Sequence, residues 1–371
     1  MKILMVARWP VGGIRTFLRY VYRESVFDDC SIVLLVPEEG LEADLDAFLP
    51  SERFAIETVP GGERELRKAV RRRLKSSNFD LLHSHGLKTG LLCEIARMGR
   101  RTPHILTVHD VFLDSTFPGP KGAIKKLVLE QALRRVTAVH AVGEDCAMNF
   151  ASHVSTVPKS RVHAISNGVD TRRFAEASPI DVRHELGLSA DTRLVGFFGR
   201  FLAQKGFRIR VNAIGRILRE GFDHPIVVLT FGWGGYIRED YQYVEEQGLK
   251  DYFLQQPHTD EAERWIKGLD VVAMPSRWEA CPLLPMEVLA AGVPIIGTDC
   301  LGLREVLSGT PATVVSTGDE QALAHALRKE LERPRRGEFE SYSPTAVERF
   351  AVSESARRLR SLYSQVEGPG Q

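Results

Sequence analysis

The stretch VVAMPSRWEACPLLPMEVLAAGVPIIGTD, from Val271 to Asp299, decides the fold of this 371-residue chain. It begins with the apolar run Val271–Ser276, which is typical of a buried strand. After a loop, Pro285–Ala291 is expected to form a helix with Pro285 at its first position, where a proline is tolerated. A second apolar run, Pro294–Asp299, closes the stretch. Strand, helix and strand in this order predict a parallel βαβ unit.

Apolar runs and amphipathic segments alternate in the same way along most of the chain, with one polar, turn-rich interruption at Asn167–Thr192. The chain is also too long for one core. We therefore predict an α/β protein with two Rossmann-like, doubly wound parallel sheets that face each other across a cleft, in residues 1–175 and 176–346. The other predicted strands are Lys2–Ala7, Ser31–Pro37, Leu81–His85, Ile105–His109, Ala138–Val142, Leu194–Phe198 and Ile226–Gly232, and the predicted helices include Thr16–Ser25, Lys121–Arg135 and Val347–Val366.

The composition is that of an ordinary globular protein, with 43% apolar residues, 26% charged residues and a net charge of +1. This balance argues against a dedicated nucleic-acid binder. The sequence shows neither a signal peptide nor an apolar run of the roughly 20 residues that a membrane span needs. Its five cysteines are scattered without a CxxC pair, which indicates free thiols. We expect a cytoplasmic protein.

Two glutamates in the opening stretch are candidate ligand contacts, because ligands of parallel sheets bind beyond the carboxyl ends of the strands. Glu287, in the first turn of the predicted helix, can accept two hydrogen bonds from a vicinal diol such as a ribose. Glu279, on the preceding loop, would reach another part of the same ligand. The amides of Leu283 and Leu284 would be free to bind phosphate. The alternative is that a glutamate in a first turn only stabilises its helix, by about 0.3–1 kcal/mol.

Two further segments follow predicted strands. GRFLAQKG, Gly199–Gly206, places Arg200 and Lys205 where paired cations would suit a diphosphate. The alternative is two solvated surface charges. In WPVGGIRTF, Gly12 and Gly13 allow close approach of the backbone to a phosphate or sugar, although the dinucleotide fingerprint GxGxxG is absent.

Taken in order, these segments resemble the retaining glycosyltransferases of the GT-B fold, particularly glycosyltransferase family four. Glu279 and Glu287 match the E-x7-E signature of that family, and the resemblance spans nearly the whole chain. It implies a C-terminal helix, at about 347–371, that crosses back to the N-terminal domain. The other matching segments are Gly12–Gly13, HSHG at His83–Gly86, VHD at Val108–Asp110, NGVD at Asn167–Asp170, GRFLAQKG, and GTDCLGLREVL at Gly297–Leu307.

The resemblance implies a role for each matching residue. Arg200 and Lys205 would bind the donor diphosphate, Glu287 the ribose, and Glu279 the transferred sugar near its reacting carbon. The amides of Leu283 and Leu284 would contact the phosphates or the sugar. In the N-terminal domain, Gly12 and Gly13 would bind the donor, with Gly13 closing over the diphosphate. His109 would contact the sugar, whereas His83 and His85 are expected in the core or at the surface, with His85 able to line the acceptor side.

The implied activity is transfer of a sugar, with retention of configuration, from a nucleoside-diphosphate sugar to a glycan, lipid-linked or small-molecule acceptor. Bacterial polysaccharide or lipopolysaccharide assembly is the expected setting, with a UDP or GDP sugar as donor. No cofactor and no metal are expected. The DLD at Asp44–Asp46 imitates a metal-binding DxD, but it lies away from any strand end, which favours solvated charges. FGWGGY at Phe231–Tyr236 and FLQQPHTDE at Phe253–Glu261 depart from the family pattern, and the base therefore stays open.

The basic segment Arg64–Lys75, with its neighbour Lys121–Val136, has two interpretations. Basic amphipathic helices bind anionic membrane surfaces, and a peripheral position at the inner face of the cell membrane would suit a lipid-linked acceptor. A solvated helix face explains the same pattern.

Two other classes of function are weighed against a transferase. A nucleotide-dependent oxidoreductase or epimerase would share the sheet, but the GxGxxG and the Tyr-x-x-x-Lys pair of such enzymes are missing. A non-catalytic nucleotide-sugar-binding protein would have lost charged residues that this sequence keeps.

Overall fold

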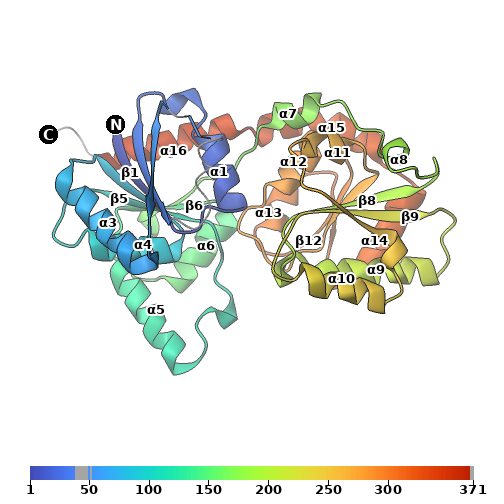
Figure 1. Ribbon diagram of the computed structural model, residues 1–371, viewed down its shortest axis with the longest axis horizontal. Coiled ribbons are helices and arrows are strands. Elements are labelled where there is room, and N and C mark those ends of the chain that lie inside the picture. The colour runs from blue at the N-terminus through green and yellow to red at the C-terminus, as the bar shows by residue number, and fades with distance from the viewer. Residues whose placement is uncertain (38–48, 51, 368–371) are drawn as a thin grey trace. The chain divides into compact units, whose positions relative to one another are not determined.

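Two separate parallel sheets organise the chain in the computed structural model, which describes residues 1–37, 49–50 and 52–367 (Figure 1). Unit 1 comprises Met1–Gly168 and Val352–Gln371, and unit 2 comprises Val169–Ala351. The sequence placed the boundaries at residues 175 and 346. Unit 2 begins earlier in the structure because helix α7, Thr171–Glu176, packs against helices α12 and α15 of that unit. The DLD at Asp44–Asp46 lies outside the described residues.

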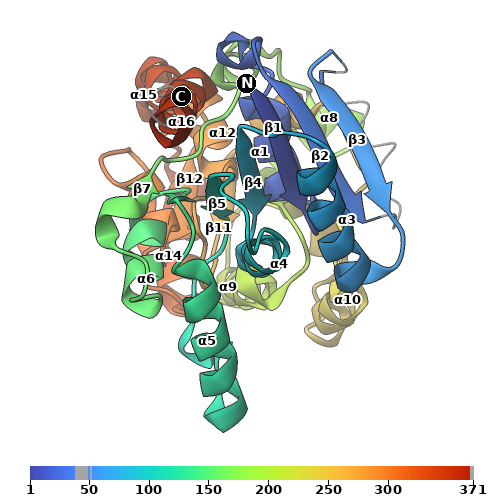
Figure 2. The same ribbon diagram turned by 90° about the vertical axis from the view of Figure 1, so that its left-hand side faces the viewer.

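Unit 1 is built on a seven-stranded, wholly parallel sheet of order β3-β2-β1-β4-β5-β6-β7. Every residue of β4, β5 and β6 is buried, because helices cover both faces of the sheet. Helix α5 extends away from the rest of this unit (Figures 1 and 2). The strands are β1 Lys2–Ala7, β2 Ser31–Pro37, β3 Phe54–Val59, β4 Leu81–His85, β5 His104–Val108, β6 Ala138–Ala141 and β7 Val162–Ala164, and the helices are α1 Gly13–Val21, α3 Gly62–Ser76, α4 Leu87–Ala96, α5 Gly119–Leu133, α6 Glu144–His153 and α16 Val352–Glu367.

Unit 2 has a six-stranded parallel sheet of order β10-β9-β8-β11-β12-β13. The aromatic rings of Phe197, Phe201 and Phe207 pack together beneath it. The strands are β8 Arg193–Phe198, β9 Ile226–Phe231, β10 Phe253–Gln256, β11 Val271–Met274, β12 Ile295–Thr298 and β13 Thr313–Val315, and the helices are α7 Thr171–Glu176, α8 Val182–Glu185, α9 Phe207–Arg219, α10 Ile237–Glu246, α11 Ala262–Lys267, α12 Leu284–Ala290, α13 Leu303–Leu307, α14 Glu320–Glu332 and α15 Arg336–Arg349. Short 3-10 turns occur at Ser25–Phe27, Asp114–Thr116, Lys159–Arg161, Ala203–Lys205 and Lys250–Tyr252.

The two predicted α/β sheets are confirmed. The predicted strands Lys2–Ala7, Ser31–Pro37 and Leu81–His85 match the observed ones, and the other predicted strands differ from them by one or two residues at their ends. Four strands are absent from the prediction, and they share one property: β3, β7, β10 and β13 are the outer strands of the two sheets. Their residues are largely half-buried or exposed, so they lack the continuous apolar run that marks an inner strand.

The C-terminal helix belongs to unit 1, as expected, but the predicted helix Val347–Val366 is wrong in its start. Helix α15 ends at Arg349, and α16 begins at Val352 after a break at Phe350–Ala351. In α16 the buried hydroxyl of Tyr363 lies 2.6 Å from the hydroxyl of Tyr22, and it also hydrogen-bonds to Nδ1 of His83 on β4. These contacts make α16 part of the core of unit 1.

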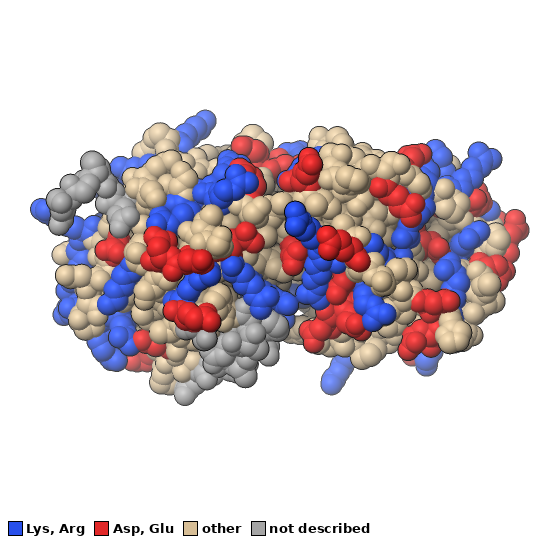
Figure 3. All heavy atoms as spheres, turned by 90° about the horizontal axis from the view of Figure 1, so that it is seen from above, with Lys and Arg blue, Asp and Glu red and all other residues tan. Residues whose placement is uncertain are grey.

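On the face drawn in Figure 3, basic and acidic side chains are interspersed, with no broad area of one sign. The mixture agrees with the balanced composition of the chain. Within the described ranges, we find no helix with both the length and the apolar character that a bilayer crossing requires.

Candidate active site

The order of the strands in unit 2 defines where a ligand can bind. Strands β8 and β11 are neighbours, but the chain leaves β8 towards β9 on one side and leaves β11 towards β12 on the other. Such a reversal opens a crevice beyond the carboxyl ends of the two strands. The loops that begin there are Gly199–Gly206 and Pro275–Leu283, which carry four of the six site residues predicted in unit 2.

The two loops meet through an ion pair. Lys205 Nζ lies 2.6 Å from Oε1 of Glu279, whose side chain is only 6% exposed. Ser276 Oγ donates to the same oxygen at 2.8 Å, and Gln204 Nε2 lies 3.3 Å from Oε2. The structure thus brings together a cation and a carboxylate that are 74 residues apart in the sequence.

Gln204 and Ser276, which hold Glu279 in place, were missed by the sequence analysis. Gln204 also donates to the carbonyl of Trp278 at 2.8 Å, and its own carbonyl accepts from the amide of Arg277. The carbonyl of Ser276 accepts from Thr298 Oγ1 at 2.6 Å. Both residues lie inside segments that the sequence analysis quoted, but neither carries a charge. The only signal in the sequence is that each is a polar residue beside or near a predicted contact.

Glycine is required where these two loops touch and where the loop after β12 touches the backbone of Glu279. Gly206, which follows Lys205, has φ 63°, and a Cβ atom there would lie 2.0 Å from the carbonyl oxygen of Pro275. Gly302 has φ 73°, and a Cβ atom there would lie 2.5 Å from the carbonyl oxygen of Glu279. A side chain at either position would push the loops apart. The backbone around Lys205 and Glu279 is therefore fixed from both sides.

Arg200 lies on the same loop as Lys205 but against a different neighbour. Its guanidinium carbon is 5.3 Å from the ring centroid of Trp233, within the range of a cation–π contact. Trp233 is 59% exposed and belongs to the FGWGGY segment after β9. In the described part of the chain, the Nε atom of Arg200 is buried without a hydrogen-bond partner. Trp233 is thus a further neighbour of the site that the sequence did not assign.

Glu287 lies in the first turn of α12, as predicted. The helix starts at Leu284, so Pro285 occupies its second position and the predicted first position is wrong by one residue. Leu283 is the N-cap residue, and among the described residues no side chain caps the amides at this helix start. Burial raises the pKa of Glu287 to about 7, while the charge of Arg173 opposes the shift.

The predicted contacts of unit 1 follow its strands β1 and β5. Gly12, between β1 and α1, has φ 57°, and a Cβ atom on Gly13 would meet nothing within 4 Å. His109 follows β5, and its Nε2 atom lies 3.0 Å from Nδ1 of His85. The ring of Phe17 packs edge-on against His109, with centroids 5.1 Å apart. Burial lowers the pKa of His109 well below its usual range, so this imidazole is neutral.

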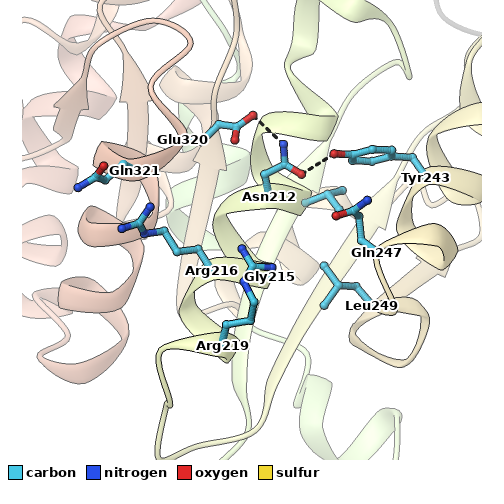
Figure 4. Close-up of a pocket in the computed structure, with 10 residues that line it drawn as sticks. Asn212, Gly215, Arg216, Arg219, Tyr243, Gln247, Leu249, Glu320 and Gln321 are labelled. Atoms are coloured by element: carbon cyan, nitrogen blue, oxygen red, sulfur yellow. Dashed lines mark hydrogen bonds between the residues drawn. The ribbon is translucent and has the colours of Figure 1, made fainter.

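A separate cavity of about 280 Å³ lies in unit 2 between α9, α10 and α14 (Figure 4). Asn212 donates to Glu320 and accepts from the hydroxyl of Tyr243, each at 2.7 Å. None of the predicted site residues lines this cavity, which is distinct from the loops after β8 and β11. In the described part of the chain, no group of three or more His, Cys, Asp and Glu side chains is arranged to hold a metal ion.

Two family profiles match the chain one after the other. The Glycosyltransferase Family 4 profile matches residues 11–173, and the Glycosyl transferases group 1 profile matches residues 192–333. Among solved structures, Alr3699/HepE of Anabaena in complex with UDP-glucose aligns with a TM-score of 0.84 and 20% identity, covering 98% of this chain and 100% of that one. Sucrose-phosphate synthase of Thermosynechococcus elongatus aligns with a TM-score of 0.81 and 18% identity, covering 98% of each chain.

Curated relatives agree with the profiles. The D-inositol 3-phosphate glycosyltransferase of Corynebacterium urealyticum is 27% identical over 79% of this chain and 74% of its own length. The lipopolysaccharide core biosynthesis mannosyltransferase LpsB of Rhizobium meliloti is 27% identical over 54% of this chain and 60% of its own length. The fold with its two parallel sheets is that of the GT-B glycosyltransferases. Within that class, the chain belongs to glycosyltransferase family four.

The Lys205–Glu279 ion pair can be tested by a double-mutant cycle. Lys205→Ala leaves a buried carboxylate without its cation, and we expect the free energy of unfolding to fall by about 1–3 kcal/mol. Adding Glu279→Ala should recover part of that loss, because no unpaired charge then remains. Urea unfolding followed by tryptophan fluorescence reports on unit 2, which holds Trp233, Trp265 and Trp278. A double mutant no more stable than Lys205→Ala would contradict the pairing.

Proposed function

We propose that this protein is a retaining, metal-independent glycosyltransferase that moves a sugar from a nucleoside-diphosphate sugar to a glycan or lipid-linked acceptor in bacterial polysaccharide or lipopolysaccharide assembly. The observation that carries the proposal is the contact between Lys205 and Glu279 at the switch point of unit 2. Two similar proteins support the substrate class. One aligned structure contains UDP-glucose, and one relative is named as a UDP-Gal:alpha-D-GlcNAc-diphosphoundecaprenol alpha-1,3-galactosyltransferase.

The chemistry follows from where charge develops. Cleavage of the glycosyl–phosphate bond builds negative charge on the leaving diphosphate and positive charge on the sugar. We assign Arg200 and Lys205 to the first charge and Glu279 to the second. Two cations on one loop can neutralise a diphosphate without a metal ion. In the free protein Lys205 is already paired with Glu279, so a bound phosphate oxygen must share or replace that partner.

The other predicted contacts complete the proposed donor site. Glu287 accepts hydrogen bonds from the ribose hydroxyls, and the amides of Leu283 and Leu284 bind the phosphates or the sugar. Unit 1 contributes Gly12 and Gly13, which bind the diphosphate, and His109, which contacts the transferred sugar. For retention of configuration, the acceptor attacks from the face that the diphosphate leaves, and the leaving phosphate accepts the proton of the acceptor hydroxyl.

Selective stabilisation by a nucleotide tests the function. We expect UDP or GDP, rather than ADP, CMP or dTDP, to raise the melting temperature, because a ligand that binds only the folded state stabilises it.

Arg200→Ala should lower kcat by about 100- to 1000-fold, the usual effect of losing one transition-state donor. Its melting temperature should stay close to that of the wild type.

The matched control is Arg219→Ala, which removes an exposed arginine on α9 and should leave turnover unchanged. Equal turnover in wild type and a folded Arg200→Ala variant would rule out the diphosphate role. The absence of stabilisation by all five nucleotides would overturn the donor proposal itself.

The ionisation of Glu287 predicts a pH dependence of donor binding. With a pKa of about 7, this carboxyl group is half protonated near neutral pH. A carboxylate accepts stronger hydrogen bonds from a diol than a carboxylic acid does. We expect the KM for the nucleotide sugar to fall as the pH rises from about 6 to about 8, and Glu287→Gln to abolish this dependence. A pH profile of Glu287→Gln that still follows the wild type would contradict the assignment.

The stability of the folded protein should fall over the same rise in pH that improves donor binding. The folded protein holds the Glu287 proton more tightly than the unfolded chain does, because the pKa of this group in the unfolded chain is near 4.5. The contribution of this group to stability is therefore complete below pH 4.5 and is lost as the pH rises through about 7. The melting temperature of Glu287→Gln relative to the wild type should be higher at pH 8 than at pH 5. Glu348→Gln, at an exposed position of α15, serves as the control.

A lipid-linked acceptor would place unit 1 at a membrane surface, and we propose that α5 makes this contact. Its side chains Ile124, Leu127 and Val128 are 63%, 56% and 51% exposed, and lysines lie between and beside them. Apolar side chains flanked by lysines suit an anionic bilayer. The predicted segment Arg64–Lys75 lies on α3, whose apolar side chains Leu66, Val70 and Leu74 are in the core, so only its charges can contribute.

Flotation with vesicles separates the contribution of the apolar side chains of α5 from that of the charges of α3. Ile124→Ser combined with Leu127→Ser should abolish binding to vesicles that contain phosphatidylglycerol, because the apolar contact is lost. Arg67→Gln combined with Arg71→Gln, on the exposed face of α3, should only weaken binding and its dependence on salt. Binding that the first pair leaves intact would exclude α5. No salt-sensitive binding by the wild type would end the membrane proposal.

A further inference from the structure

The contact between His85 and His109 has no part in the proposed function so far. His85, the last residue of β4, is 2% exposed, and His109 follows the neighbouring strand β5. Nδ1 of His85 lies 3.0 Å from Nε2 of His109. The two rings are inclined by 26°, with centroids 5.3 Å apart. Phe17 packs against both rings.

The number of protons on the two rings limits how they can hydrogen-bond to each other. Burial lowers the pKa of both imidazoles well below the usual range, so each ring is neutral and carries one proton. A single hydrogen must therefore occupy the contact between Nδ1 of His85 and Nε2 of His109. It belongs either to His85, which then donates, or to His109.

The far nitrogen of His85 decides between these two arrangements. Its Nε2 atom is buried and has no hydrogen-bond partner among the residues that the structure describes. If His109 donated, His85 would carry its proton on Nε2, and a buried N–H group would be left without an acceptor. Orphaned N–H groups are rarer in folded proteins than under-satisfied acceptors. The arrangement with the proton on Nδ1 of His85 leaves only a bare lone pair, near the rings of His83 and Phe17.

We propose that His85 is a positioning residue that donates from Nδ1 to Nε2 of His109, fixes the ring of His109, and makes it present an Nδ1–H donor to an oxygen of the transferred sugar. This inference rests on the proposed contact of His109 with the sugar. A neutral N–H donor binds a hydroxyl oxygen without placing a positive charge beside the sugar, where positive charge develops in the reaction.

His83 shows what a purely structural histidine looks like in the same sheet. Its Nδ1 atom bonds to Tyr363, and its Nε2 atom lies 2.6 Å from Oγ1 of Thr107. Both of its nitrogens have partners within unit 1. His109 differs because the hydrogen bond from His85 uses one nitrogen and leaves the other for a ligand.

Nitrogen-15 NMR of the full chain with labelled histidine tests the inference without any substrate. Long-range proton–nitrogen spectra distinguish the two tautomers, and His109→Gln identifies the signal of His109. We expect His109 in the Nδ1–H form in the wild type. In His85→Leu we expect a mixture of the two forms, and in His85→Asp, whose carboxylate accepts, the Nε2–H form. Finding His109 in the Nε2–H form in the wild type overturns the proposal, whatever the variants do.

Measurements of kcat then test whether the tautomer of His109 matters for the reaction. His85→Asn keeps an N–H donor close to the place of Nδ1 and should retain most of the kcat, whereas His85→Leu and His85→Asp should lower kcat about tenfold or more. The rise in melting temperature caused by the nucleotide should be equal in all three, because His85 does not touch the nucleotide. Equal kcat in His85→Asn and a folded His85→Leu would refute the positioning role. If the wild type has the Nδ1–H tautomer but neither turnover nor stabilisation by a nucleotide, the proposed function fails instead.

Discussion

The ion pair between Lys205 and Glu279 exists because β8 and β11 are neighbours in a parallel sheet. Parallel strands deliver the loops that follow them to one edge of the sheet, and the change of direction between these two strands leaves room for a ligand there. The glycines at 206 and 302 then let the loops approach to backbone contact. The position of every charged group proposed for the donor follows from that strand order.

The sequence predicted the inner strands because most of them are buried on both faces and read as continuous apolar runs, as β1 and β11 do. It missed the outer strands, such as β10, whose side chains are partly solvated and lack that run. Helix α12 was predicted to within one residue, since Pro285 and Glu287 mark its start. The break at Phe350–Ala351 has no glycine or proline within it, and only tertiary packing reveals it.

The candidate site also contains some residues that could be predicted from the sequence and others that could not. Charged residues next to strand ends, such as Lys205 and Glu279, could be found from position and residue type. The side chains that orient them could not, because Ser276 and Gln204 act through hydrogen bonds that depend on loop conformation. The histidines of unit 1 show even more clearly that side-chain contacts cannot be predicted from residue type and position. His83 lies inside β4, His85 at its end and His109 just after β5, and only the contacts of their nitrogens separate a core residue from a candidate ligand contact.

The return of α16 to unit 1 has a consequence for how the chain is made. Unit 2 is one continuous segment, whereas unit 1 is completed by residues that the ribosome adds after all of unit 2. Until α16 emerges, the hydroxyl of Tyr22 and Nδ1 of His83 lack the partner that Tyr363 supplies. In the usual order of vectorial folding, the N-terminal domain is complete first. Here the whole of unit 2 leaves the ribosome before the last helix of unit 1, so the inserted unit has its full sequence available for folding first.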